Sequence, residues 1–172
     1  MRLFLTVLGM LAATPALALE VVESVLQVSY THNGTSYVFN DSYVPLLPAN
    51  VCYTWYLRVD AAATPLTVVE RMTLPEAIQW GTPGSDPGDE TVIEEGGKVA
   101  VTTIAVTTDD LGWFSHGWCA AEGDPTGGHL FEISAGGAEL ATFPFTVVAP
   151  EDYTFPAPVF PERALRSASN TW

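Results

Sequence analysis

Hydrophobic and polar residues alternate over several short stretches of the chain, and residues that favour turns separate these stretches. Asn33-Gly34 and Gly136-Gly137 each lie between two alternating stretches, so both predict hairpin turns. Residues 113–121 mix aromatic residues with His and Cys, and their pattern assigns no element, although one short helical turn fits within residues 110–121. The predicted strands are residues 21–30, 36–39, 51–59, 66–74, 98–107, 129–135 and 139–148.

About seven to nine strands at roughly even spacing, with no helix of useful length, predict an all-β protein. A single antiparallel β-sandwich over residues 19–150 is favoured over a barrel for two reasons. The two cysteines lie far apart in the sequence, and an aromatic cluster of Trp55, Trp113 and Trp118 lies close to them. The chain has 172 residues, of which 154 remain after the first 18, a usual size for one domain.

The first 18 residues have the organisation of a bacterial secretory signal peptide. Arg2 supplies a positive charge, residues 3–11 an apolar run, and Ala16-Leu17-Ala18 a cleavage pattern of small residues. Because the apolar run is too short to span a bilayer permanently, we expect no stable membrane insertion after cleavage. The sequence therefore predicts a periplasmic or secreted protein.

Cys52 and Cys119 are the two cysteines of the chain. An even number in an exported chain predicts a disulfide, and closure of so long a loop would stabilise the fold by about 4 kcal/mol. A long-range bridge between the two sheets is familiar in β-sandwiches. The alternatives are a free thiol or a metal site in which both cysteines join His116 and His129.

Residues 122–148 carry a pattern that resembles the last hairpin of bacterial secreted immunoglobulin-like domains. The pattern is Gly-Asp-Pro-x-Gly at residues 123–127, an apolar strand, a glycine-containing turn and Phe-x-Val at residues 145–147. The resemblance implies that the sandwich is a single immunoglobulin-like antiparallel β-sandwich, and it carries no activity with it. Cys119 departs from the antibody pattern because two predicted strands follow it, so a bridge from Cys119 need not join the usual pair of strands.

The charge is lopsided, with 20 acidic against 6 basic residues and a formal net charge of −14. Such a surface repels phosphate backbones and anionic lipids, so nucleic acid and membrane surfaces are disfavoured as partners. A cationic partner or divalent ions stay open. Residues 151–172 differ from this body, because prolines alternate there with aromatic residues and predict an extended or disordered tail, or an arm that docks on a partner.

The residue pattern disfavours catalysis. Ser115 and His116 are neighbours, so in a strand they would point to opposite faces, and the chain has no Gly-x-Ser-x-Gly motif. The acidic residues gather in predicted loops, whereas a glycosidase needs two carboxylates that flank a cleft. Asp86, Asp89 and Glu90 offer oxygen ligands in a loop rich in Gly and Pro, which leaves a calcium site as an alternative to solvated charge.

A binding surface is the remaining candidate for function. Trp80, Trp113, Trp118, His116 and Asp124 lie in or beside two turn-rich segments and would form it, unless the tryptophans are core residues of the sandwich. We expect an exported, non-catalytic binding or accessory module of the bacterial cell envelope, with no cofactor, whose partner is another envelope or extracellular protein. A carbohydrate-binding or carbohydrate-active protein that uses the aromatic and acidic loops is the alternative, and the oligomeric state stays open.

Overall fold

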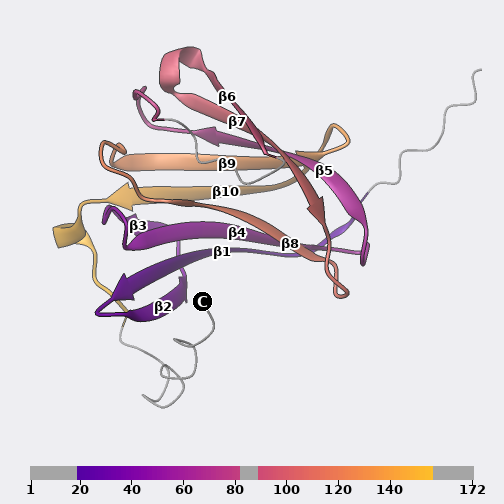
Figure 1. Ribbon diagram of the computed structural model, residues 1–172, viewed down its shortest axis with the longest axis horizontal. Coiled ribbons are helices and arrows are strands. Elements are labelled where there is room, and N and C mark those ends of the chain that lie inside the picture. The colour runs from indigo at the N-terminus through magenta and orange to yellow at the C-terminus, as the bar shows by residue number, and fades with distance from the viewer. Residues whose placement is uncertain (1–18, 82–88, 157–172) are drawn as a thin grey trace, which may run out of the picture.

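The computed structural model describes residues 19–81 and 89–156, which form two β-sheets packed face to face (Figure 1). The four-stranded sheet has the order β2-β1-β4-β8, and the six-stranded sheet has the order β3-β10-β9-β5-β7-β6. Neighbouring strands are antiparallel except for β3, which runs parallel to β10. This architecture confirms the predicted all-β, immunoglobulin-like sandwich.

The elements in chain order are β1 (Val21–His32), β2 (Thr35–Asn40), β3 (Tyr43–Pro45), β4 (Val51–Val59), β5 (Pro65–Thr73), β6 (Glu90–Glu94), the 3₁₀ turn η1 (Glu95–Gly97), β7 (Val99–Thr107), β8 (Trp113–Cys119), β9 (Gly127–Ala135), β10 (Ala138–Val148) and the 3₁₀ turn η2 (Pro150–Asp152).

The core follows from the alternation along the strands, because successive side chains of a strand point to opposite faces of its sheet. In β4, the odd-numbered side chains are buried between the sheets and the even-numbered ones lie on the outer face. Trp55 and Leu57 are both 0% exposed. Strand β5 meets them from the other sheet with Val68, Glu70 and Met72 pointing inward. The sequence pattern thus determines which face of each strand is buried in the core.

Three strands were not predicted. Tyr43–Pro45 forms the short strand β3, which pairs with β10 at one edge of the six-stranded sheet. Residues 113–119, expected to hold at most a helical turn, form β8, an edge strand of the four-stranded sheet that pairs with β4 residue for residue. Glu90–Glu94 forms β6 at the edge of the six-stranded sheet, although its acidic residues suggested a loop. Charged side chains are common on edge strands, where they face solvent and discourage pairing with other chains.

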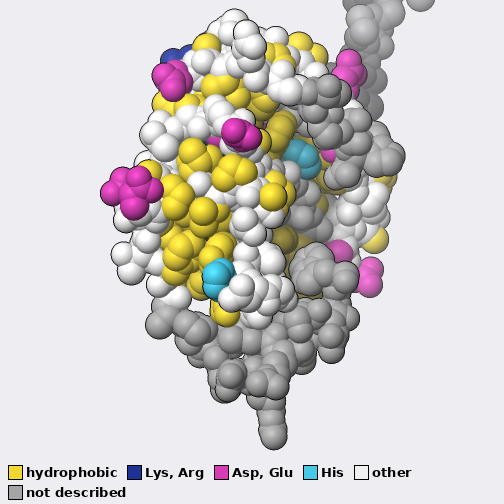
Figure 2. Space-filling model, turned by 60° about the vertical axis from the view of Figure 1, so that its left-hand side comes forward, with side chains coloured by type: hydrophobic (Ala, Val, Ile, Leu, Met, Phe, Trp, Pro, Cys, Tyr) yellow, Lys and Arg dark blue, Asp and Glu magenta, His cyan; other side chains and the backbone are white. Residues whose placement is uncertain are grey.

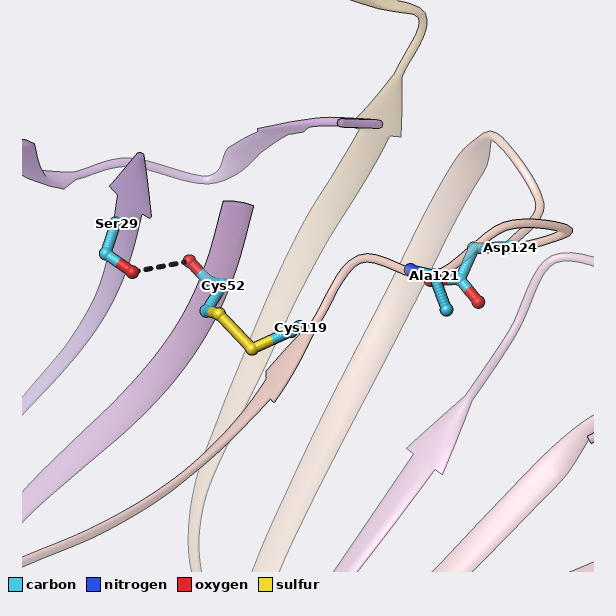
Figure 3. The surroundings of a disulfide bond; sticks show 5 residues. All are labelled: Ser29, Cys52, Cys119, Ala121 and Asp124. Atoms are coloured by element: carbon cyan, nitrogen blue, oxygen red, sulfur yellow. Dashed lines mark hydrogen bonds between the residues drawn. A yellow bond between two sulfur atoms is a disulfide. The ribbon is translucent and has the colours of Figure 1, made fainter. Parts of the chain in front are cut away.

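The predicted disulfide between Cys52 and Cys119 is present, with an S–S distance of 2.01 Å (Figure 3). The expectation that it would bridge the two sheets is wrong, because Cys52 and Cys119 are register partners on the adjacent strands β4 and β8. Val51 and Tyr53 point inward, so Cys52 between them points to the outer face of its sheet. Strands β9 and β10 follow Cys119, as the departure from the antibody pattern predicted.

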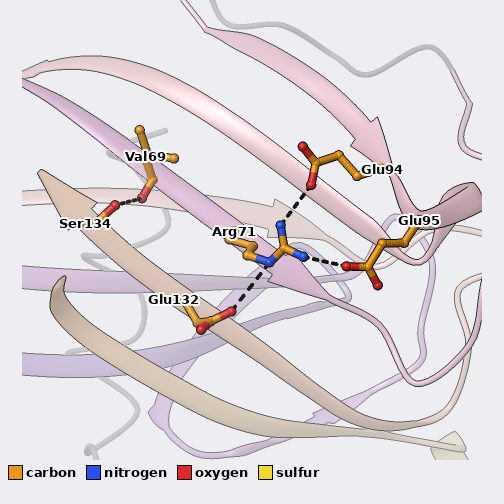
Figure 4. A network of polar contacts seen from close by, with 6 residues as sticks. All are labelled: Val69, Arg71, Glu94, Glu95, Glu132 and Ser134. Atoms are coloured by element: carbon orange, nitrogen blue, oxygen red, sulfur yellow. Dashed lines mark hydrogen bonds and ion pairs between the residues drawn. The ribbon is translucent and has the colours of Figure 1, made fainter. Parts of the chain in front are cut away.

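A charged cluster covers part of the outer face of the six-stranded sheet (Figure 4). The Arg71 guanidinium lies 2.9 Å from Glu94, 2.8 Å from Glu95 and 3.7 Å from Glu132. These side chains are 35 to 56% exposed, so the ion pairs contribute little to the stability of the fold. The negative charges of these three glutamates are thus partly neutralised by Arg71.

Several predictions fall outside the described residues, namely the signal peptide at residues 1–18, Asp86, and the tail beyond residue 156. The described start of the tail packs on the domain: the Tyr153 hydroxyl donates a hydrogen bond of 2.8 Å to Asp41, and the Phe155 ring lies 4.3 Å from that of Tyr30. Within the described residues, no helix is both long enough and apolar enough to cross a membrane.

Candidate functional site

A buried carboxylate lies between the sheets. Glu70 points inward from β5 and is 0% exposed. Its Oε1 accepts a hydrogen bond of 2.7 Å from the Trp118 indole, and its Oε2 accepts one from the Trp55 indole. His116 Nδ1 lies 2.9 Å from the same Oε2 and donates to it, since a carboxylate oxygen accepts. We call these four residues the Glu70 junction.

The Glu70 junction ties one sheet to the other. Glu70 belongs to the six-stranded sheet, whereas its three donors come from β4 and β8 of the four-stranded sheet. A buried carboxylate is costly unless hydrogen bonds satisfy it, and here donors reach both oxygens. The other ring nitrogen of His116 lies 3.7 Å from Asp89, so the imidazole stands between a buried and a half-buried carboxylate. The junction therefore fixes Trp118 and His116 relative to the core.

Sequence reasoning included Trp118 and His116 as candidates but missed Glu70. The signal was present, because Glu70 occupies the same face of a predicted strand as Val68 and Met72. A carboxylate at an inward position of a strand predicts a buried polar contact. Its partners could not be found in the same way, since they lie 15, 46 and 48 residues away in the sequence.

Next to the junction, a pocket of about 210 Å³ opens at the end of the sandwich where β8 ends and β9 begins. We call it the end pocket. Three segments form most of its wall: residues 78–81 after β5, the end of β8, and the turn from Ala121 to Asp124. The described side chains that line it include Tyr53, Met72, Leu74, Gln79, Trp80, Trp118, Glu122, Asp124 and His129.

Trp80 is held in the pocket wall by a close approach of two backbones. The Gly97 carbonyl accepts hydrogen bonds from the Ile78 amide at 3.2 Å and from the Trp80 indole at 2.8 Å. Gly97 has φ of +106°, and a Cβ there would lie 2.1 Å from the Ile78 carbonyl oxygen, so only glycine fits. The Trp80 ring meets the Trp118 ring edge to face, with centroids 5.9 Å apart.

Asp124 is placed by a tight turn that follows β8. Its Oδ2 accepts a hydrogen bond of 2.8 Å from the Ala121 amide, and its own amide donates one of 3.2 Å to the Ala121 carbonyl. Gly123 inside the turn has φ of +93°, a left-handed conformation that glycine adopts without strain. The Asp124 carboxylate is therefore fixed beside the disulfide end of β8, as Figure 3 shows.

The electrostatics of the end pocket are negative. Burial raises the pKa of the Tyr53 hydroxyl, and the charges of Asp124 and Glu70 raise it further, so Tyr53 stays neutral. Burial lowers the pKa of His129, although the Gly127 carbonyl and Asp124 oppose this shift, so His129 is neutral at neutral pH. No Lys or Arg is among the described residues of the lining.

The structure brings together four of the five predicted surface residues. Trp80, Trp118 and Asp124 line the end pocket, and His116 stacks edge to face on Trp118 from the junction side. Trp113 lies at the other end of β8, roughly 17 Å away by the strand rise, where Arg58 stacks over its ring at 5.8 Å. The structure therefore does not bring Trp113 together with the other four residues, because they lie near the opposite end of the same strand.

The three tryptophans predicted either as a binding platform or as core residues are half-buried. The fully buried tryptophan of the core is Trp55. Half-buried indoles keep part of each ring available to a partner while the rest packs on the domain, an arrangement typical of protein interfaces.

The structure does not bring the described residues of the predicted metal sites together as ligands of one ion. The disulfide rules out Cys52 and Cys119 as thiolate ligands. Glu90 is exposed at the start of β6, while Asp89 faces His116. In the part of the chain that the structure describes, no three His, Cys, Asp or Glu side chains gather closely enough to hold a metal ion.

The fold defines the chain as an immunoglobulin-like β-sandwich domain. Residues 24–148 match the family described as the PM0630 beta sandwich domain, and the chain belongs to that family. A comparison with curated proteins finds no match.

The solved structures that are similar to the chain include two from Pseudomonas species. One is an immunoglobulin-like protein from Pseudomonas aeruginosa, at 8% identity and a TM-score of 0.49, with 78% of this chain and 100% of that chain covered. The other is the Pseudomonas fluorescens alkylpurine DNA glycosylase AlkC bound to DNA containing an abasic site analog. There the identity is 11% and the TM-score 0.37, with 76% of this chain and 30% of that chain covered.

Proposed function

We propose that the protein is an exported, non-catalytic binding module of the bacterial cell envelope that holds a protein partner in the end pocket. The pattern of residues 1–18 supports export, and a disulfide suits an oxidising compartment. The observation that carries the proposal is the end pocket itself, where three separate segments hold two half-buried tryptophans beside a fixed carboxylate.

The size of the pocket favours an anchor side chain of a larger partner over a free small molecule. Its volume is about 210 Å³, below the roughly 300–1,000 Å³ of most small-molecule sites. Protein interfaces often concentrate their binding energy in one or two side chains that enter such pockets, with tryptophan prominent in the walls. Because hydrogen bonds hold both indoles, little ordering cost accompanies binding.

The chemistry of the site favours binding over catalysis. Glu70 is the carboxylate with the most donors, but it is 0% exposed and cannot reach a substrate. Ser115 is exposed on the outer face of its sheet while His116 points inward, so they do not form a nucleophile and base.

A displayed peptide library tests the proposal. The oxidised domain is used to select binding peptides, and the binding of each peptide to the variant Ala121→Phe is then measured. Ala121 is an exposed residue at the rim of the pocket, so the larger phenylalanine side chain would obstruct it. The matched control is Ala62→Phe, at an exposed connector beyond the far end of β4. We expect peptides that bind the wild type and the control but not Ala121→Phe. A library that yields no peptide with this behaviour would overturn the proposal.

Carbohydrate recognition is tested in the same way with an oligosaccharide array. The Trp80 and Trp118 planes meet at 67°, so the two rings do not present one flat surface to a sugar. Binding of an oligosaccharide that Ala121→Phe abolishes and Ala62→Phe keeps would replace the protein partner with a carbohydrate.

A further inference from the structure

We propose that the end pocket takes a cationic side chain of the partner, arginine in preference to lysine. This inference rests on the proposed function and names the group that the pocket recognises.

The first argument is unbalanced charge. Asp124 and Glu122 bring two carboxylates to the lining, and no described lining residue is a cation that could neutralise them. The outer face of the six-stranded sheet shows the contrast, because its acids surround Arg71. A negative pocket with low-dielectric aromatic walls concentrates its field on whatever enters, which favours a cation.

The second argument is the orientation of the tryptophans. The Trp118 N–H donates to Glu70, and the Trp80 N–H donates to the Gly97 carbonyl. Both positively polarised N–H groups are therefore bound to internal acceptors, and the exposed parts of the indoles are carbon. The faces of indole rings attract cations through the ring quadrupole, more strongly than those of other aromatic side chains.

The third argument is that Asp124 is ready to accept. Its Oδ2 is bound to the Ala121 amide, while Oδ1 has no hydrogen-bond partner among the described residues. The turn holds the carboxylate before a ligand arrives, so an incoming N–H forms a charge-assisted hydrogen bond without reordering the loop.

Arginine suits these features better than lysine. Its planar guanidinium can stack on an indole and donate two N–H groups to one carboxylate, and it loses its hydration more easily than an ammonium group. The domain itself shows related contacts, since Arg58 lies over the Trp113 ring at 5.8 Å. The two terminal nitrogens of Arg71 donate to separate carboxylates, Glu94 at 2.9 Å and Glu95 at 2.8 Å.

The test uses short capped peptides that differ in one side chain: arginine, lysine or citrulline. Citrulline has nearly the shape of arginine without its charge, so it separates recognition of a cation from recognition of shape. Each peptide is titrated into the full oxidised domain while backbone amide shifts are followed by NMR. We expect shifts in residues 118–124, the tightest binding for arginine, and binding by citrulline at least about tenfold weaker.

Two variants locate the charge that is recognised. Asp124→Asn keeps the side-chain oxygen that accepts the Ala121 amide but removes the charge, and we expect it to weaken arginine binding by about tenfold. Asp110→Asn removes the same charge from an exposed turn at the other end of β8 and should leave the affinity unchanged. Equal losses in both variants would mean that net charge alone attracts the peptide and would overturn the inference.

The outcome also separates the inference from the proposed function. Library peptides that need the end pocket but bind without any cationic residue would overturn this inference and leave the proposed function standing. Library peptides that bind elsewhere on the domain would overturn both.

Discussion

Two links hold strands β4 and β8, and they differ in almost every respect. The Cys52–Cys119 bond is covalent, lies on the outer face and joins two neighbouring strands of one sheet. The Glu70 junction is built of hydrogen bonds, is buried, and joins these two strands to β5 of the opposite sheet. In antibody domains a disulfide crosses between the sheets, whereas here a carboxylate with two indoles and an imidazole does so.

The difference explains why the covalent link lies where it does. Strand β8 is an edge strand held by β4 alone, and its last residue is Cys119, which also lines the end pocket. Ends of edge strands open most easily in folded proteins. The disulfide therefore fixes the wall of the pocket, while the junction holds the sheets together. Figure 2 shows that hydrophobic side chains gather on one side of the domain, with acidic ones scattered among them.

The junction should give the largest effect when it is broken. Glu70→Ala removes the acceptor of three buried donors, and we expect a loss of about 3–5 kcal/mol in the free energy of unfolding, measured by urea denaturation. If the variant does not fold, Glu70→Gln tests the same point, because it keeps one acceptor oxygen and should cost less. A loss below about 1 kcal/mol for Glu70→Ala would contradict the role of the junction.

Removal of the disulfide should lower the free energy of unfolding nearly as much as Glu70→Ala, but through an effect on the unfolded state. Replacement of both cysteines by serine lengthens the free chain of the unfolded state, and the loop-closure estimate for a separation of 67 residues is about 4 kcal/mol. Because the unfolded state then exposes more surface, the denaturant slope m should rise, whereas Glu70→Ala should leave m unchanged.

Hydrogen exchange of the same cysteine variant checks the local claim. Amides at the end of β8 and in the Ala121–Asp124 turn should lose protection more than those of β5. Uniform loss across both sheets would contradict a local role for the disulfide.

Two tryptophan variants should lower the free energy of unfolding by smaller amounts that differ from each other. Trp118→Phe removes a donor to the buried carboxylate, and we expect a loss of about 1.5–3 kcal/mol. Trp80→Phe removes a donor to the neutral Gly97 carbonyl, and about 1 kcal/mol is expected. Thermal and urea unfolding measure both, and a larger loss for Trp80→Phe would reverse the order that the account requires.

The smallest expected effect is a dependence of stability on pH. Because burial lowers the pKa of His129, the unfolded chain binds a proton at this residue more readily than the folded domain. The stability that neutral His129 contributes is complete above the unfolded pKa of about 6.5 and is lost as pH falls through the lower, folded value. His129→Gln should reduce this loss as pH falls below about 6.5, and an unchanged pH profile would contradict the assignment.

The strands were predictable where one residue type dominates each face. Strand β4 was predicted with its observed bounds, because β-branched and aromatic residues fill its inward positions. Strand β8 was not predicted because glycine, serine and histidine interrupt its hydrophobic pattern. Pairing with β4 nevertheless makes this segment a strand. Tertiary pairing overrides weak local preference in this way for edge strands in general.

The candidate site was predictable in its residue types and not in its geometry. Tryptophan and aspartate in turn-rich segments pointed to Trp80, Trp118 and Asp124, but nothing in the sequence shows that segments after β5 and after β8 meet. Glu70 was not predicted as a site residue because carboxylates are usually solvent-exposed. The physical signal was its position on the inward face of β5. Side-chain direction in a strand is thus a better guide than residue class to a buried polar contact.

The most direct test of the end pocket is the affinity of the strongest library peptide for the oxidised domain and for Ala121→Phe, measured by isothermal titration calorimetry. The account predicts affinity at least about tenfold weaker for Ala121→Phe, since a filled pocket excludes the anchor side chain, with Ala62→Phe unchanged. Equal affinity for all three proteins would show that the partner binds elsewhere and would contradict the account.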